Sequence, residues 1–227
     1  MSSDIEILAT VPIFSELDND VLKELRSKMT KRSYKKNNMI LMEDEFGDTF
    51  FVISSGSVKI TRVSEDGREV ILAMLGEGDF FGEMSLLDGE SRSANAISTE
   101  ESDVLILKRR DFIEFLERYP KIAISLLREM ATRLRKSDQQ IESLSLSDAE
   151  HRIGVTLLRL AEELGKIRMG VVEIGNLPYQ QDIANMAGTS RETVSRMFKV
   201  LEERGLIRRR GHALSILDYT SFKRAFN

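Results

Sequence analysis

The sequence predicts an α+β protein in which an antiparallel β-roll is followed by a long helix and then by a small helical domain that ends in a β-hairpin. Three observations predict this order. Seven of the 14 glycines lie between Gly47 and Gly89 and separate short apolar or alternating runs, as in antiparallel strands joined by turns. The stretch Lys121–Leu146 contains neither glycine nor proline, which favours one long helix. The last third combines helical spacing, a glycine turn and a final alternating segment.

The elements of the first part follow from local patterns. Asp18–Lys28 has helical spacing, and Asp111–Arg118 is a second short helix that ends before Pro120. The clearest turn, at Gly67, joins two strands. The strands of the roll are expected at six runs: Met39–Met42, Thr49–Ile53, Ser57–Val63, Val70–Leu75, Ala94–Ser98 and Val104–Lys108.

The long helix carries the spacing of a two-stranded coiled coil. Apolar or small residues recur at intervals of three and four, at Leu127, Met130, Leu134, Ser137, Ile141 and Leu144. We expect this helix to pair with its own copy across a two-fold axis. The alternative is a helix that lies on its own roll. Ser137, with Asp138 beside it, interrupts the apolar seam, and such a polar break either fixes the register or meets a ligand.

The last segment has the element order of a winged helix-turn-helix. A helix at Asp148–Leu164 and a strand at Val171–Ile174 precede two helices, and an alternating hairpin at Leu206–Leu217 follows them. The two helices, Tyr179–Ala187 and Ser190–Arg204, are separated by Gly188 and Thr189. Residues 151–227 carry 13 Lys and Arg against 8 Asp and Glu, whereas residues 1–150 carry 20 against 29. A basic module on an acidic body suggests a polyanionic partner.

The second of these helices carries side chains suited to reading DNA. Thr189 or Ser190 can cap its start, where free N–H groups suit a phosphate. Its exposed face is expected to hold Arg191, Glu192, Ser195 and Arg196. Arginine can donate to guanine and glutamate can accept from cytosine, although Glu192 and Arg196 could also form an ordinary ion pair on a solvated helix. Contacts to the DNA backbone are expected from Lys199, Arg208, Arg209 and Arg210.

The glycine-rich segment from residue 78 to residue 94 suits a ribose phosphate. A turn beginning at Gly82 offers backbone N–H groups, Arg92 offers a forked cation and Ser93 adds a hydroxyl. Glu83 is informative because a carboxylate near a phosphate is useful when it accepts from a sugar hydroxyl. The alternative is a loop with an internal salt bridge between Glu83 and Arg92.

Both motifs resemble those of one family. Residues 81–94, FGEMSLLDGESRSA, resemble the phosphate-binding cassette of cyclic-nucleotide-binding domains, and residues 190–196, SRETVSR, resemble the recognition helix of the cyclic AMP receptor protein and fumarate–nitrate regulator family. The order of roll, long helix and winged helix-turn-helix is similar too. The resemblance implies that Gly82 and Glu83 hold the ribose and that Arg92 and Ser93 hold the cyclic phosphate. It also implies that Arg133 and Ser137 face the ligand, with Asp138 reaching from the partner subunit.

Asp138 departs from the family pattern, in which two neighbouring hydroxyl residues are common at this place. The full set implied for the effector, most simply cyclic AMP, is Gly82, Glu83, Met84, Ser85, Arg92, Ser93, Ala94, Arg133, Ser137 and Asp138. The set implied for DNA is Gln181, Thr189, Ser190, Arg191, Glu192, Ser195, Arg196 and Lys199.

Together these inferences predict a homodimeric transcription regulator with three parts: residues 1–120 bind the nucleotide, 121–147 dimerise and 148–227 bind double-stranded DNA. We expect inverted-repeat operators of TGTGA type and contact with RNA polymerase. Cyclic GMP, cyclic di-GMP or no nucleotide are alternatives, as is a regulatory subunit that acts on proteins instead of DNA.

The composition excludes several other classes. The chain has 227 residues, 41% hydrophobic and 31% charged, a balance typical of ordered globular proteins. No apolar run approaches the ~20 residues of a membrane helix, and the N-terminus does not resemble a secretory signal, so we expect a cytoplasmic protein outside the membrane.

We also expect neither a metal or haem cofactor nor a catalytic site. The chain has no cysteine, which excludes thiolate-bound iron–sulfur clusters, and no histidine precedes His151, so a histidine-bound haem in the roll does not fit. His151 and His212 are interpreted as surface or helix-packing residues and not as metal ligands. No nucleophile–base pair or phosphate-binding Walker loop is recognisable, so we expect no enzyme.

Overall fold

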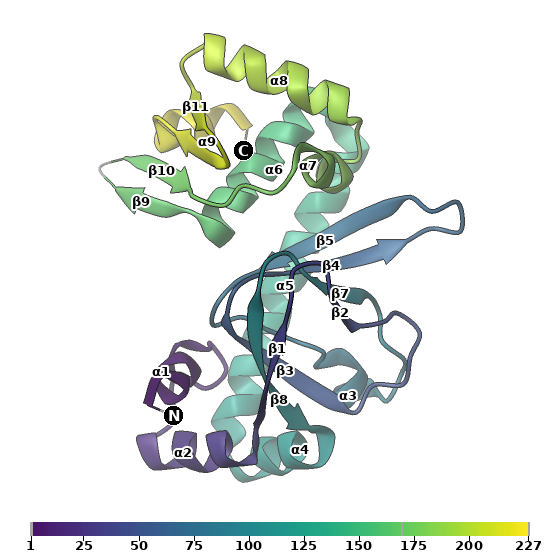
Figure 1. The fold of residues 1–227 in the computed structure, drawn as a ribbon, viewed down its shortest axis with the longest axis vertical. Helices are drawn as coiled ribbons and strands as arrows, with labels where there is room; N and C mark the ends of the chain where they lie inside the picture. Colours follow the sequence, from purple (N-terminus) through teal and green to yellow (C-terminus); the bar gives the residue numbers. More distant parts are fainter. Residues whose placement is uncertain (1, 169, 227) are drawn as a thin grey trace. The chain divides into compact units, whose positions relative to one another are not determined.

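The computed structural model describes residues 2–168 and 170–226, which form two compact units. Within the described residues, one unit consists of residues 2–62 and 72–136, and the other of residues 63–71, 137–168 and 170–226. Each is described by itself below (Figure 1).

Two four-stranded sheets build the roll, and most of their residues belong to the first unit. Strands β1 (Thr30–Tyr34), β8 (Ser102–Lys108), β3 (Thr49–Ser55) and β6 (Phe80–Phe81) form one sheet in that order. Strands β2 (Met39–Leu41), β7 (Asn95–Ser98), β4 (Val58–Val63) and β5 (Glu69–Leu75) form the other. The recorded pairings within them are antiparallel, and a short helix, α3 (Met84–Asp88), follows β6. The predicted antiparallel roll is confirmed.

Strand β3 contributes side chains both to the core between roll and helices and to the interior of the roll. Because successive side chains of a strand point to opposite faces, Phe50 and Val52 pack with the helices while Phe51 and Ile53 enter the roll interior. All four are buried, so the strand appears in the sequence as a continuous apolar run. The rings of Phe51 and Phe81 stack at 5.0 Å inside the roll.

Besides α3, four helices accompany the roll. Of these, α1 (Ser2–Thr10), α2 (Asn19–Lys28) and α4 (Arg109–Arg118) gather at one end of the unit, near the start of α5 (Pro120–Leu146) (Figure 1). Phe112 of α4 stacks on Phe50 of β3 at 4.6 Å. Ile122 and Leu126, in the first turns of α5, belong to the same core. This core anchors the start of the long helix against the roll.

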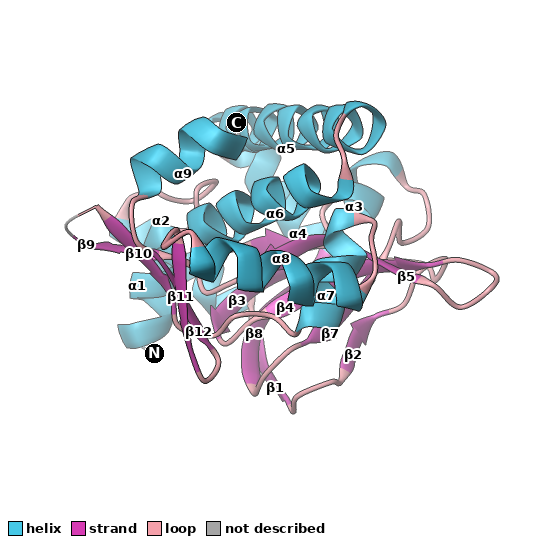
Figure 2. Cartoon of the chain, turned by 90° about the horizontal axis from the view of Figure 1, so that it is seen from above, coloured by secondary structure: helices cyan, strands magenta, loops and turns pink. Residues whose placement is uncertain are grey.

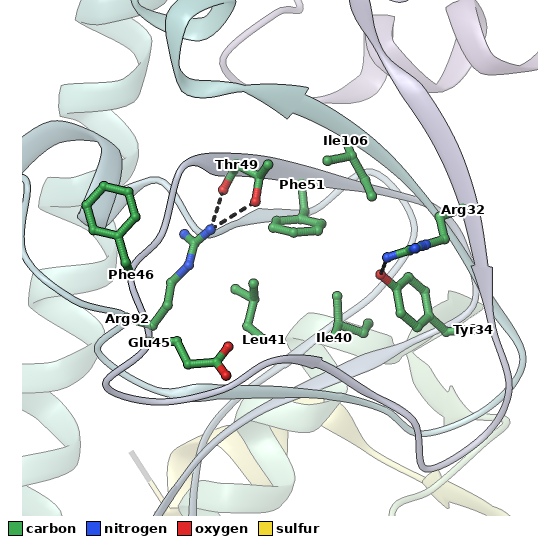
Figure 3. Close-up of a pocket in the computed structure, with 10 residues that line it drawn as sticks. All are labelled: Arg32, Tyr34, Ile40, Leu41, Glu45, Phe46, Thr49, Phe51, Arg92 and Ile106. Atoms are coloured by element: carbon green, nitrogen blue, oxygen red, sulfur yellow. Dashed lines mark hydrogen bonds between the residues drawn. The ribbon is translucent and has the colours of Figure 1, made fainter.

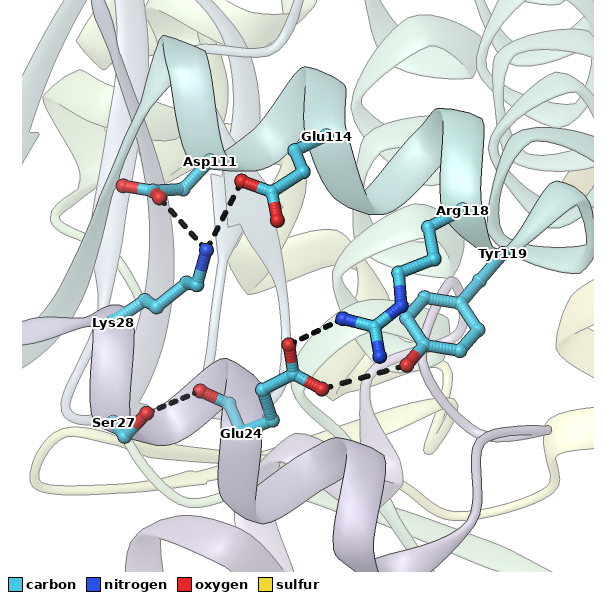
Figure 4. A network of polar contacts seen from close by, with 7 residues as sticks. All are labelled: Glu24, Ser27, Lys28, Asp111, Glu114, Arg118 and Tyr119. Atoms are coloured by element: carbon cyan, nitrogen blue, oxygen red, sulfur yellow. Dashed lines mark hydrogen bonds and ion pairs between the residues drawn. The ribbon is translucent and has the colours of Figure 1, made fainter.

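Polar contacts also tie α2 to α4 (Figure 4). The Lys28 Nζ donates to Asp111 Oδ1 and to Glu114 Oε2, each at 3.1 Å. Arg118 donates to Glu24 Oε1 at 2.7 Å. These pairs are partly solvated and therefore fix the orientation of the helices more than they add stability.

The second unit is a winged helix-turn-helix. It contains α6 (Ala149–Leu164), α7 (Gln180–Ala187), α8 (Arg191–Glu203) and α9 (Tyr219–Phe226). Its sheet has the order β11 (Ile207–Arg210), β12 (Ala213–Ile216), β10 (Val171–Ile174) and β9 (Lys166–Arg168). Figure 2 shows α6, α7 and α8 packed together beside these strands.

Several elements escape the sequence patterns. The edge strand β1 is mostly exposed and β9 is wholly exposed, so neither shows an apolar alternation. The terminal helices α1 and α9 are short, and α9 is held through Phe222, which is fully buried. No helix in the described part of the chain has both the length and the apolar character needed to cross a bilayer.

Candidate functional site

The turn after β6 places the first candidate residues. Gly82 has φ +81°, and a Cβ at this position would lie 3.0 Å from Arg92 Nη1 and 3.1 Å from the carbonyl oxygen of Thr49. Glycine is therefore needed both for the backbone conformation and for the close approach of Arg92. Glu83 follows, and α3 then ends at Gly89, which has φ +79°.

Arg92 is a buried cation held by neutral groups. Its side chain is 4% exposed. Nη1 donates to the Gly82 carbonyl and to Ser85 Oγ, both at 2.7 Å. Nη2 donates to the carbonyl and hydroxyl oxygens of Thr49, at 2.8 and 3.1 Å. Burial lowers the pKa of Arg92, but a guanidinium keeps its proton in proteins. All four acceptors of Arg92 are neutral, and the carboxylates of Asp48 and Glu83 act on its charge without a hydrogen bond to it, so this turn is a candidate anion site.

Glu83 is the matching buried acid, 3% exposed. Its Oε1 accepts from Arg133 Nη1 at 3.2 Å, while Oε2 is buried without a hydrogen-bond partner among the described residues. Burial raises the pKa of Glu83, and the charge of Arg133 opposes that rise. A buried acceptor without a donor is costly, so this oxygen fits a hydroxyl supplied by a ligand. The ion pair of Glu83 is with Arg133, and the alternative of a Glu83–Arg92 salt bridge is wrong.

Arg133 connects α5 with this turn. Its Nη2 donates to the carbonyl oxygen of Phe80 at 2.9 Å, and its guanidinium lies 4.4 Å from the centre of the Phe80 ring. Ser137 follows one turn later in α5 and Asp138 comes next, both with exposed side chains. The structure thus brings Arg133 to Glu83 and leaves Ser137 and Asp138 on the helix surface.

The remaining cassette residues divide by exposure. Ser85 and Ala94 are buried, whereas Met84 and Ser93 are exposed. Thr49 was not expected from the sequence, because it comes 43 residues before Arg92, and it accepts two of the hydrogen bonds of Arg92. Gly47 was not expected either, and a Cβ there would lie 2.2 Å from Arg92 Nε. The only sequence signal for this close approach is that Gly47 comes just before the strand that begins at Thr49.

The second candidate surface lies on α8. Ser190 caps the helix, because its side chain accepts from the backbone N–H of Thr193. Gly188 has φ +58° at the turn, as expected from the sequence, and Ile183 and Val194 are fully buried on either side. The predicted DNA-contact residues of α8 are all exposed: Arg191, Glu192, Ser195, Arg196 and Lys199. Gln181 is exposed on α7, while Thr189 is half-buried in the turn. This face presents forked donors and one acceptor to solvent.

Arg209 differs from the expectation of a free cation on the wing. Its Nε and Nη2 donate to the two carboxylate oxygens of Glu202, at 3.0 and 2.6 Å, and its guanidinium lies 5.0 Å from the centre of the Phe198 ring. This ion pair ties the wing to α8, and the expected phosphate contact of Arg209 stays a prediction. Its neighbours Arg208 and Arg210 are exposed.

A stripe of apolar side chains is exposed along α5. Leu127 is 69% exposed, Leu134 63%, Ile141 62% and Leu144 46%. They occupy four of the six predicted seam positions. Met130, by contrast, packs against the core of the first unit. We name Leu127, Leu134, Ile141 and Leu144 the α5 stripe.

The histidines take part in packing. His151 lies 5.9 Å from Phe226 and His212 lies 6.3 Å from Tyr179, measured between ring centres. Among residues 2–168 and 170–226, no group of three or more His, Cys, Asp or Glu side chains could hold a metal ion.

Comparison with known proteins gives two family matches. Residues 31–119 match the cyclic nucleotide-binding domain and residues 151–225 match the Crp-like helix-turn-helix domain. The chain is 35% identical to the cyclic AMP receptor protein of Thermus thermophilus, over 87% of this chain and 88% of that protein. It is 32% identical to the CRP-like cAMP-activated global transcriptional regulator of Mycobacterium tuberculosis, over 94% and 95% of the two chains.

Solved structures agree with these matches. The structure of FixK2 from Bradyrhizobium japonicum has a TM-score of 0.77 at 25% identity and covers 86% of this chain and 96% of its own. The catabolite activator protein of Thermus thermophilus has a TM-score of 0.55 at 31% identity and covers 94% of this chain and 97% of its own.

Proposed function

The chain belongs to the family of Crp-like, cyclic-nucleotide-responsive transcription regulators, and on that premise we propose that it binds cyclic AMP in the roll and DNA through α8 as a homodimer. The observation that carries the proposal is that Glu83 and Arg92 are both buried in this turn without pairing with each other. Glu83 has a carboxylate oxygen without a hydrogen-bond partner among the described residues, and Arg92 is a cation held by neutral acceptors. Cyclic AMP offers a hydroxyl donor and a phosphate on one ribose.

The proposed contacts to the effector combine this geometry with the family resemblance. The Oε2 of Glu83 accepts from the ribose 2′-hydroxyl, and Arg92 and Ser93 bind the cyclic phosphate. Ser137 faces the base, and Asp138 reaches the base from the partner subunit. The other proposed ligand-site residues are Gly82, Met84, Ser85, Ala94 and Arg133. The names of the Thermus and Mycobacterium relatives, which refer to cyclic AMP, favour that nucleotide over cyclic GMP or cyclic di-GMP.

The proposed dimer uses the α5 stripe. Exposed leucine and isoleucine side chains at heptad spacing pack well against a second copy, since each seam residue then meets its equivalent across the two-fold axis. A nucleotide that bridges two such helices favours one placement of the two recognition helices. The coupling free energy in such systems is typically ~1–3 kcal/mol.

The proposed DNA contacts lie on α8. Arg191, Glu192, Ser195 and Arg196 read base edges, while Gln181, Thr189, Ser190 and Lys199 complete the surface. We expect an inverted repeat of a TGTGA-type element with half-sites one helical turn apart. The protein would act in the cytoplasm as a transcription factor, without an enzymatic step, and would contact RNA polymerase at its promoters.

Calorimetric titration tests the effector site. The wild-type protein should bind cyclic AMP more tightly than cyclic GMP or cyclic di-GMP. Arg92→Leu should weaken cyclic AMP binding by at least about tenfold, because the phosphate loses a charge-assisted, forked donor. Arg68→Leu is a matched control, since Arg68 is exposed and paired with Asp66. Equal affinities of the Arg92→Leu variant and the wild type would refute the cassette assignment.

A further inference from the structure

The roll contains a cavity that shares one residue, Arg92, with the proposed nucleotide contacts (Figure 3). Its volume is about 340 Å³. The lining comes from both sheets, including their edge strands β1 and β2, and from the loop that follows β2. The lining residues are Arg32, Tyr34, Ile40, Leu41, Glu45, Phe46, Thr49, Phe51, Arg92 and Ile106.

This cavity differs from the proposed nucleotide site. Of the residues proposed to bind the nucleotide, only Arg92 borders it. The Arg92 guanidinium points toward Thr49 at one end of the cavity, where it already donates to four acceptors (Figure 3). Arg92 and Thr49 therefore form a wall of the cavity on the side of the cassette.

The two ends of the cavity differ in charge. Arg92 and Glu45 lie at the same end, where a cation and a carboxylate offset one another (Figure 3). Arg32 lies at the other end, and its recorded hydrogen bond, to the hydroxyl of Tyr34, is long at 3.5 Å. A carboxylate can replace this long bond with two charge-assisted bonds to the guanidinium fork. The Arg32 end thus favours a single negative charge.

The centre of the cavity is apolar. Phe51, Leu41 and Ile40 lie between the two ends, with Ile106 beside them (Figure 3). The three aliphatic residues are only half-buried, so an occupant would remove further apolar surface from water. Small-molecule sites commonly combine an apolar lining with a few polar groups and occupy roughly 300–1,000 Å³, so this cavity suits a compact metabolite.

We propose that this cavity binds a small apolar carboxylate, with its apolar body against Ile40, Phe51 and Ile106 and its carboxylate on Arg32. The proposal does not depend on which nucleotide the cassette binds. Because Arg92 lines the cavity and is also proposed to bind the cyclic phosphate, the cavity would give the proposed cyclic AMP regulator a second ligand input.

Calorimetry with 3-phenylpropionate as the probe tests the charge of the ligand. The full-length protein should bind it with a dissociation constant on the order of 1 mM or below, as expected for a ligand of this size. The neutral 3-phenylpropionamide, or the Arg32→Ala variant with the acid, should show about tenfold weaker binding. Arg68→Ala is the control, because it removes an equal charge from an exposed turn and should leave affinity unchanged.

Two further variants separate the cavity from the nucleotide site. Ile40→Trp fills the cavity at an edge strand and should abolish binding of 3-phenylpropionate while cyclic AMP still binds. Glu83→Gln should weaken cyclic AMP binding and leave the probe unaffected. Absence of saturable probe binding to the wild type, equal affinity for the acid and the amide, or loss of the probe in Glu83→Gln alone would overturn the proposal.

Discussion

Replacing Leu134 by alanine should weaken the proposed dimer, because Leu134 lies within the α5 stripe and is 63% exposed in the single chain. Full burial of a leucine side chain stabilises by about 1.5–3 kcal/mol. Because about two-thirds of the Leu134 side chain is still exposed in the single chain, its burial in the dimer interface would contribute ~1–2 kcal/mol. The dimer contains two copies of Leu134, so the total contribution is ~2–4 kcal/mol. The dimer dissociation constant should rise by roughly 30- to 1,000-fold.

Sedimentation velocity over a range of protein concentrations measures this change directly. Leu87→Ala is the matched control: Leu87 is 45% exposed on α3, outside α5, and its replacement should leave the dimer constant unchanged. Circular dichroism should show equal helix content in both variants. A wild type that sediments as a monomer with nucleotide and DNA present, or a Leu134→Ala variant with the wild-type dimer constant, would refute the coiled-coil reasoning.

Three further outcomes are expected. Burial raises the pKa of Glu83 above its ordinary value of 4.5, so cyclic AMP affinity measured by calorimetry should fall as the pH drops through the raised pKa and the carboxylate gains a proton. Glu83→Gln should flatten this decline. Identical pH profiles of the variant and the wild type would count against the ribose contact. Arg209→Ala should lower the free energy of unfolding by about 1–2 kcal/mol, because Glu202 loses its partner, and should keep the salt dependence of DNA binding. Arg208→Ala should instead reduce the slope of log affinity against log salt concentration by about one. A smaller slope in Arg209→Ala and an unchanged slope in Arg208→Ala would support a phosphate contact by Arg209. Glu192→Ala should relax discrimination at one base pair by ~1–3 kcal/mol in titrations against single-base operator variants, and an unaltered base preference would remove Glu192 from the reading face.

The sequence predicts those parts of the fold that local patterning controls. Three features that depend on residues close together in the chain are present in the structure. They are the turn at Gly188, the helix cap by Ser190, and the neighbouring strands β4 and β5 that the turn at Gly67 joins. The glycines that separate the strands and the uninterrupted stretch of α5 likewise reveal the architecture.

What the sequence does not predict depends on partners far apart in the chain. Thr49 accepts from Arg92 across 43 residues, and Arg133 meets Glu83 across 50, so neither contact has a local pattern. Arg209 lies in a run of three arginines, and only the structure distinguishes the one paired with Glu202. Charge composition alone therefore does not show which of these arginines already has a carboxylate partner within the chain.

The most direct test of the account is DNA binding measured by fluorescence anisotropy as cyclic AMP is added. The labelled duplex would carry an inverted TGTGA repeat, and a scrambled duplex would serve as the control. The account predicts that cyclic AMP increases the affinity of the wild type for the repeat by roughly 5- to 150-fold, the range of typical allosteric coupling. At the same cyclic AMP concentrations, Arg92→Leu should show no such increase. An affinity for the repeat that is the same with and without cyclic AMP would contradict it.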